Sequence, residues 1–200
     1  MDQFIEMGLT YGQTLDHKYI KNLSTLIMND EKSMTMDVYD TIIAIIDCND
    51  GQISGRTAIH KLAFFIDQLI PEIEIPPHKP HFYGPFNEEI AVSLEKLVSY
   101  SFLEERKIPG YRYDSYQYRL TPDGGDMART LESENPTTYR RIDEIIETCN
   151  DFCGLRAAPL SYAAKIYYML KMHPGSKMTY EDAVNEGKKL DWNLSQSNAE

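Results

Sequence analysis

The chain has 200 residues, of which 20 are Lys or Arg and 31 are Asp or Glu, so its net charge is −11. This excess of negative charge excludes a general affinity for polyanions, because binding to phosphates needs Lys and Arg. With 42% hydrophobic and 26% charged residues, the composition is that of a globular protein with a substantial core.

The distribution of apolar residues and cysteines indicates a cytoplasmic protein. Residues 1–6 lack the basic and continuous apolar segments of a secretory signal. The apolar run at 42–46 is far shorter than the roughly 20 residues that cross a bilayer. The three cysteines, Cys48, Cys149 and Cys153, are too few for a disulfide framework. We therefore expect free, buried thiols and no contact with a membrane.

Apolar spacing in the first part of the chain predicts three helices. Residues 11–30 repeat apolar side chains every three or four positions and form an N-terminal extension that a polar break follows. A short helix then runs from Val38 to the break at Asn49-Asp50-Gly51, where Gly51 can take the left-handed conformation. A longer helix has its apolar face between residues 59 and 70 and is stopped by Pro71.

A proline-rich connection leads to the next helix. Residues 71–85 include five prolines, which predicts an extended, stiff segment, and Tyr83-Gly84-Pro85 is interpreted as a backbone turn. Asn87 can cap the helix that follows. The inner face of that helix has Ile90, Leu94, Leu97 and Val98, and its outer face has Glu88, Glu89, Ser93, Glu95 and Lys96.

The second half of the chain begins with a predicted β-hairpin. Segments 102–108 and 115–120 are rich in tyrosine and branched residues and flank Pro109-Gly110, which suits two strands around a turn. Thr121-Pro122 and Asn135-Pro136 each start a helix. Two further helices are predicted, one over Leu160–Met172 and one after Thr179.

The helix after Asn135 has a narrow apolar seam. The seam consists of Tyr139, Ile142, Ile146, Cys149 and Cys153. It can pack on the C-terminal helices or across the axis of a homodimer, and packing within the chain is the preferred interpretation.

The order of these elements predicts the fold class. Three helices followed by a two-stranded hairpin and another helix are typical of a winged-helix domain. We therefore predict a mainly α protein of the α+β type, with a winged-helix core at 37–131 whose hairpin is the wing. Residues 1–36 form an N-terminal helical extension, and residues 132–200 form a C-terminal helical subdomain.

Three consecutive motifs resemble a narrower group of winged-helix proteins. They are residues 55–65 (GRTAIHKLAFF), residues 82–86 (FYGPF) and the strand at 118–121. In this order and spacing they look like the signatures of the YwgA-like and Panacea-type proteins, over about residues 37–131. The resemblance implies a non-enzymatic regulatory protein from a group in which some members are tied to toxin neutralisation or phage defence.

The third helix does not suit the usual function of a winged helix. That function places the helix in the major groove of DNA, while the wing contacts phosphates. Here Glu88, Glu89 and Glu95 face outward against Lys96 alone, so a duplex would repel the helix. Its acidic face is either a solvated surface without a role or a protein-binding surface.

The predicted wing is the least acidic part of the domain. Its cations are Arg106, Lys107, Arg112 and Arg119, and Tyr111 lies with them near the tip. Arg and Tyr together can contact a phosphate backbone or form the hot spot of a protein interface. Alternatively, the wing tyrosines pack on the domain as strand residues. Residues 106–113 are therefore a candidate binding tip.

A small basic spot is predicted at the start of the second helix. Arg56, His60 and Lys61 are close in sequence there and could meet an acidic partner or a phosphate. In the alternative interpretation, Arg56 pairs with Asp50 or with a helix end.

The sequence carries no pattern typical of catalysis or metal binding. Segment 47–51 resembles part of an EF-hand loop, but Gln52 and Ala58 stand where that loop needs Gly and Glu. His78 and His81 have no ligand pair at zinc-finger spacing. A phosphate loop and a nucleophile elbow are also missing. We expect no cofactor, no metal and no enzymatic activity.

These observations lead to two hypotheses on function. The first is an antitoxin-like or adaptor-like regulator that binds another protein, and a basic toxin or nuclease would fit its charge. The alternative is a transcription regulator that binds DNA through the wing of a symmetric dimer. The candidate contact residues are Arg56, Lys61, Glu88, Glu89, Lys96, Arg106, Lys107, Tyr111 and Arg112.

Overall fold

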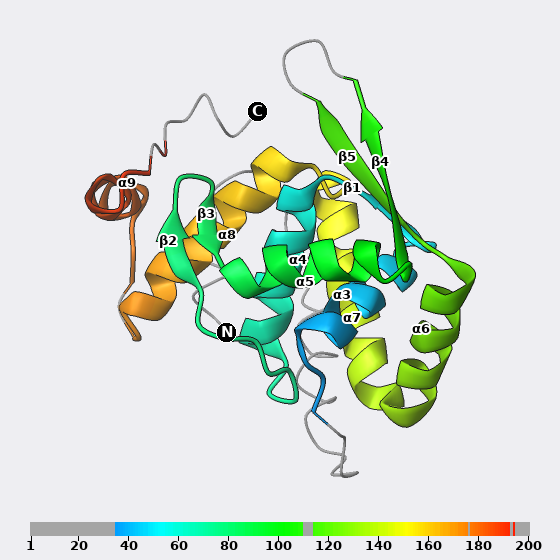
Figure 1. Ribbon diagram of the computed structural model, residues 1–200. Coiled ribbons are helices and arrows are strands. Elements are labelled where there is room, and N and C mark those ends of the chain that lie inside the picture. Colours follow the sequence, from blue (N-terminus) through cyan, green and yellow to red (C-terminus); the bar gives the residue numbers. More distant parts are fainter. Residues whose placement is uncertain (1–34, 110–113, 176, 193, 195–200) are drawn as a thin grey trace.

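The computed structural model describes residues 35–109, 114–175, 177–192 and 194. The described chain is mostly helical, with one three-stranded antiparallel sheet and one separate two-stranded hairpin (Figure 1). The prediction of a mainly α protein with a small sheet is therefore confirmed. The helix predicted at 11–30 lies outside the described residues.

The first helices of the described chain have the predicted bounds. They are α3 (Val38–Asp47), α4 (Arg56–Leu69) and α5 (Glu88–Ser99). The Asp37 carboxylate caps α3 by accepting backbone N–H groups of its first turn, and the Asn87 side chain caps α5 in the same way. Helix α4 ends directly before Ile70 and Pro71, because proline cannot continue it.

The predicted hairpin is confirmed, and it belongs to a larger sheet. Strands β4 (Leu103–Ile108) and β5 (Ser115–Leu120) pair in antiparallel register from Leu103 opposite Leu120 to Ile108 opposite Ser115. Strand β1 (Gln52–Ser54) pairs with the other edge of β5, so the order is β1-β5-β4. Sequence analysis missed β1 because three residues are too short to show a two-residue period.

A second hairpin lies inside the proline-rich connection. It consists of β2 (Lys79–His81) and β3 (Gly84–Phe86), with Pro80 opposite Pro85. Prolines are tolerated because neither strand has another neighbour that needs the missing N–H. Gly84 has a φ of 102°, which glycine adopts readily. The predicted turn is confirmed in part, because it lies at Phe82 and Tyr83, while Gly84 and Pro85 belong to β3.

The four C-terminal helices are α6 (Pro122–Glu134), α7 (Pro136–Cys153), α8 (Ala157–Met172) and α9 (Tyr180–Lys189). Three of the four start at the predicted signals, and α8 begins at Ala157, three residues before the predicted start. Thr121 caps α6, and Thr179 forms a capping box with Asp182 at the start of α9. Among the described helices, none combines the length and apolar character that crossing a membrane requires.

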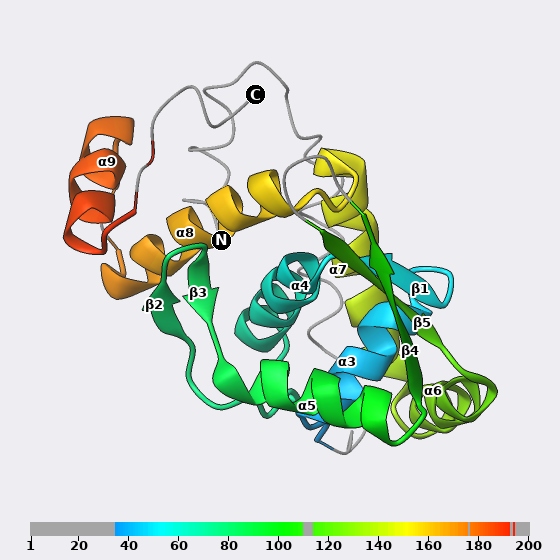
Figure 2. The same cartoon turned by 45° about the horizontal axis from the view of Figure 1, so that its top comes forward.

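One hydrophobic cluster joins most of these elements. Helix α4 lies at its centre, with α3, α5, α7 and α8 around it (Figure 2). The predicted seam of α7 packs into this cluster, so it is occupied within the chain, and a homodimer would need another surface. The cluster also crosses residue 131, and the predicted division into subdomains there stays a prediction. A smaller cluster around Trp192 attaches α9.

The first turn of α6 offers a test of this packing. A Cβ atom added at Gly124 would overlap the carbonyl oxygen of Phe102, whereas at Gly125 the nearest atom is Nη1 of Arg129 at 3.5 Å. We expect Gly124→Ala to lower the free energy of unfolding by about 1–3 kcal/mol. Gly125→Ala should leave it unchanged or raise it by up to about 1 kcal/mol. Urea unfolding followed by circular dichroism measures both, and equal stabilities would contradict this packing.

Candidate functional site

The exposed face of α5 is acidic, as the sequence predicted. Glu88, Glu89 and Glu95 are exposed and make no ion pair with a described residue. The one basic residue of this helix, Lys96, donates from Nζ to the hydroxyl of Tyr39 at 3.1 Å. Lys96 also attracts Glu89, so the three glutamates face solvent with one nearby cation among them.

This acidic face also has apolar members. Val92 is 37% exposed and follows Glu88 by one helical turn, and Tyr100 at the helix end is 67% exposed. Ser93 was predicted on this face, but that is wrong because it is fully buried. It lies one turn before Leu97 and therefore belongs to the inner stripe. Apolar side chains beside charges are typical of a protein interface.

Arg56 connects α4 to the β4–β5 hairpin, the predicted wing. Its Nε donates to the hydroxyl of Tyr118 at 2.6 Å, and its Nη2 lies 2.8 Å from the carboxylate of Glu105. The guanidinium also lies over the ring of Tyr116, 4.5 Å from the centroid. Burial favours a higher pKa for Glu105, but hydrogen bonds from Tyr118 and Arg56 outweigh it and hold this pKa below its usual range. The predicted pairing of Arg56 with Asp50 or a helix end is wrong, because its partners Tyr118 and Glu105 lie on the β4–β5 hairpin. Its role as a contact residue stays a prediction, since its side chain is still 44% exposed.

Two cations of the β4–β5 hairpin have close polar neighbours. Lys107 pairs with Asp114 at 2.5 Å, and Arg119 donates to the side-chain oxygen of Gln52 at 3.2 Å. Arg106 is exposed. Tyr111 and Arg112 lie outside the described residues, so the binding role of the tip stays a prediction.

Two of the three members of the predicted basic spot on α4, His60 and Lys61, are buried. Lys61 is only 2% exposed, and its Nζ donates to the carbonyl oxygen of Pro85 at 2.5 Å. Burial, and then the charge of Lys165, lowers the pKa of Lys61 to about 8. His60 is also buried, and burial lowers its pKa to about 3, so it is neutral. The prediction of Lys61 as a contact residue is therefore wrong, because neighbouring elements cover this side of α4.

An exposed aromatic pair was missed by sequence reasoning. Phe82 and Tyr83, at the tip of the β2–β3 hairpin, are 70% and 60% exposed, and their ring centroids are 5.0 Å apart. The hairpin is anchored from two sides, by Lys61 on Pro85 and by the indole N–H of Trp192, which donates to His81 at 2.7 Å. The motif FYGPF at residues 82–86 indicates this pair, since it places two aromatic residues directly before Gly84, but the sequence analysis interpreted it only as a backbone turn.

The described residues contain no group of His, Cys, Asp and Glu side chains placed to hold a metal ion. The thiol of Cys153 donates to the carbonyl oxygen of Cys149, and burial raises the pKa of Cys149 to about 12. These two side chains act as small apolar residues of the α7 seam.

Comparison with known proteins supports the resemblance that the motifs suggested. No protein-family model matches the chain. The chain is similar to the uncharacterised protein YwgA of Bacillus subtilis (strain 168), with 29% identity over 121 residues. The match covers 54% of this chain and 70% of that protein. The chain therefore resembles the YwgA-like group.

The buried Lys61 predicts an unusual dependence of stability on pH. Its pKa is about 8 in the folded chain and has its ordinary value of 10.5 in the unfolded chain, so between these pH values the unfolded chain binds more protons. Stability should therefore rise with pH across this window, by up to about 3 kcal/mol. We expect Lys61→Met to remove this rise in urea unfolding at pH 7 to 10.5. Lys189→Met, at a side chain that is 70% exposed, is the control that should keep it.

Proposed function

We propose that this chain is a non-enzymatic regulatory protein that binds a basic protein partner through the acidic face of α5. One observation carries the proposal: three exposed glutamates outnumber the single cation of α5, Lys96, which also donates to Tyr39, and none of the three forms a close ion pair with a described residue. The net charge of −11 adds long-range attraction to a basic partner. Val92 and Tyr100 supply apolar area for the same contact.

The proposal includes a winged-helix core. The order α3, β1, α4, α5, β4, β5 and the sheet order β1-β5-β4 support it, because winged helices combine three helices with a small sheet whose last two strands form the wing. The chain departs from this arrangement between α4 and α5. Residues 70–87 and their hairpin replace the short turn that joins these helices in DNA-binding domains.

Within this function, we favour an antitoxin-like or adaptor-like role in the cytoplasm. Toxins and nucleases that act on nucleic acids need basic surfaces to bind phosphates. An acidic protein face can cover such a surface and compete with the nucleic acid. The resemblance to the YwgA-like group is compatible with this role, which the charge pattern of α5 motivates.

A neutralised α5 face tests the proposal. The variant Glu88→Gln, Glu89→Gln and Glu95→Gln should lose most of the basic proteins that the tagged wild type captures from lysate of its own host. The matched control, Glu132→Gln, Glu147→Gln and Asp151→Asn, removes the same charge from exposed positions on α6 and α7. It should retain these proteins. Equal loss in both variants would show that net charge, and not the α5 face, binds the partner.

Duplex DNA binding tests the alternative function. The exposed Arg106 is the feature of the described wing that favours DNA. We expect no change in fluorescence anisotropy of a mixed-sequence duplex at physiological salt and only weak binding at low salt. If binding is tight, falls steeply with salt and disappears in Arg106→Ala, Lys107→Ala and Arg112→Ala, the protein is a DNA-binding regulator instead.

A further inference from the structure

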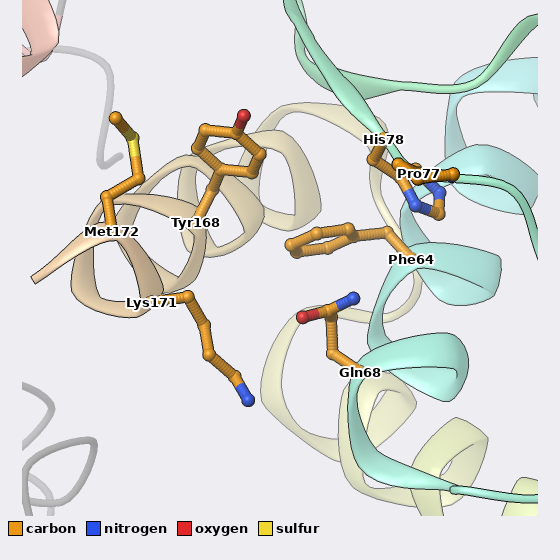
Figure 3. Close-up of a pocket in the computed structure, with 7 residues that line it drawn as sticks. All are labelled: Phe64, Gln68, Pro77, His78, Tyr168, Lys171 and Met172. Atoms are coloured by element: carbon orange, nitrogen blue, oxygen red, sulfur yellow. The ribbon is translucent and has the colours of Figure 1, made fainter. Parts of the chain in front are cut away.

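A small cavity opens between the C-terminal turns of α4 and α8 and the residues just before β2, Pro77 and His78. Its volume is about 260 Å³, at the low end for small-molecule sites. Figure 3 shows the side chains that line it, Phe64, Gln68, Pro77, His78, Tyr168, Lys171 and Met172. Two aromatic rings and a methionine provide its walls, and an amide, an imidazole and an ammonium group provide its polar atoms.

Asp67, next to this lining, determines which polar atoms are available. Its Oδ2 accepts a hydrogen bond from Nε2 of Gln68 at 2.7 Å and lies 3.5 Å from Nδ1 of His78. The amide of Gln68 is thereby oriented with its oxygen free. A carboxylate beside Nδ1 favours the His78 tautomer with its proton on Nδ1, so Nε2 is an acceptor. Both atoms can therefore accept hydrogen bonds from an occupant.

The burial of His78 favours an occupant that donates a hydrogen bond to its imidazole. Its side chain is only 2% exposed, and neither ring nitrogen has a hydrogen bond with a described residue. Buried polar groups are almost always hydrogen-bonded, and an unpaired one destabilises the fold. The Phe64 ring stands edge-on to His78, with 5.1 Å between centroids, so the two rings line the cavity side by side.

The electrostatic environment favours a cation. Helix α4 ends at Leu69 and α8 at Met172, so two helix C-termini with their partial negative charge lie beside the cavity. The carboxylate of Asp67 adds a full negative charge, and the ammonium of Lys171 in the lining opposes it until an occupant displaces that flexible, exposed side chain. The aromatic cluster already attracts one cation, because Nζ of Lys171 lies over the ring of Tyr167, 5.7 Å from its centroid.

We propose that this cavity binds an arginine side chain of the protein partner. The inference rests on the proposed function, since a basic partner supplies the arginine. A guanidinium is planar, carries five N–H donors and stacks on aromatic faces, which suits acceptors beside Phe64 and Tyr168. A lysine ammonium is a compact, strongly hydrated charge and matches this cavity less well.

A short arginine derivative tests the cavity without the partner. Acetyl-arginine amide is titrated into the ¹⁵N-labelled full chain, and backbone amide signals are followed by NMR. We expect saturable shifts centred on residues 64–68 and 168–172, with a dissociation constant in the millimolar range. Acetyl-citrulline amide has the same shape without the charge and should bind about tenfold more weakly. Acetyl-lysine amide should also bind more weakly.

Two variants give opposite expected effects. Asp67→Asn should weaken binding of the arginine probe, because it removes the negative charge beside the cavity. Lys171→Gln should strengthen it, because an exposed competing cation is lost. Asp151→Asn on α7 is the matched control and should have no effect. Equal binding of the arginine and citrulline probes, or shifts spread over acidic surfaces instead of this cavity, would overturn the proposal.

The same measurements separate this inference from the proposed function. If the arginine probe binds in the cavity but the α5 variant still captures the partner, the proposed role of α5 is refuted and the proposed role of the cavity is supported. If the probe does not bind in the cavity while the α5 variant loses its partner, the cavity does not bind arginine, and the proposed binding function of α5 is supported.

Discussion

The burial of α4 is the constraint on which the rest of the structure depends. Its residues from Ala58 to Ile66 are all buried, so other elements must cover this helix on nearly every side. Most of these residues are apolar, and burying them stabilises the fold. Two of them, His60 and Lys61, are polar, and Lys61 needs an acceptor in the interior. The Pro85 carbonyl meets this need, which fixes β3 of the second hairpin against α4.

The sequence could predict those features whose signals are local. Caps and breakers such as Asn87, Pro71 and Thr121 act within one helical turn, and the helices begin and end where they indicate. Tyrosines alternating along β5 likewise indicated the wing. Strand β1 and the β2–β3 hairpin escaped prediction because they are three residues long and owe their form to partners distant in sequence.

The predicted surface position of Lys61 and the predicted pairing of Arg56 were wrong for the same reason, namely that their partners are distant in sequence. Lys61 and Arg56 have the composition of a surface spot, but long side chains can reach partners far along the chain. Arg56 meets Glu105 and Tyr118 on the wing, and Lys61 meets Pro85 beyond the end of α4. The acidic face of α5 was predictable because glutamates on an amphipathic helix stay exposed whatever covers the other side. What decides a surface role is therefore which charges remain unpaired after folding.

The connection between α4 and α5 links the features assigned to function. Asn87 caps α5, and its side-chain N–H₂ also donates to the carbonyl oxygen of Pro76. Directly after Pro76, Pro77 and His78 form one wall of the cavity, and the hairpin then presents Phe82 and Tyr83. One stiff, proline-rich segment thus sets the start of α5, the cavity wall and the aromatic tip. Because little conformational freedom is left to lose here, a partner that contacts these features pays little entropy for ordering them.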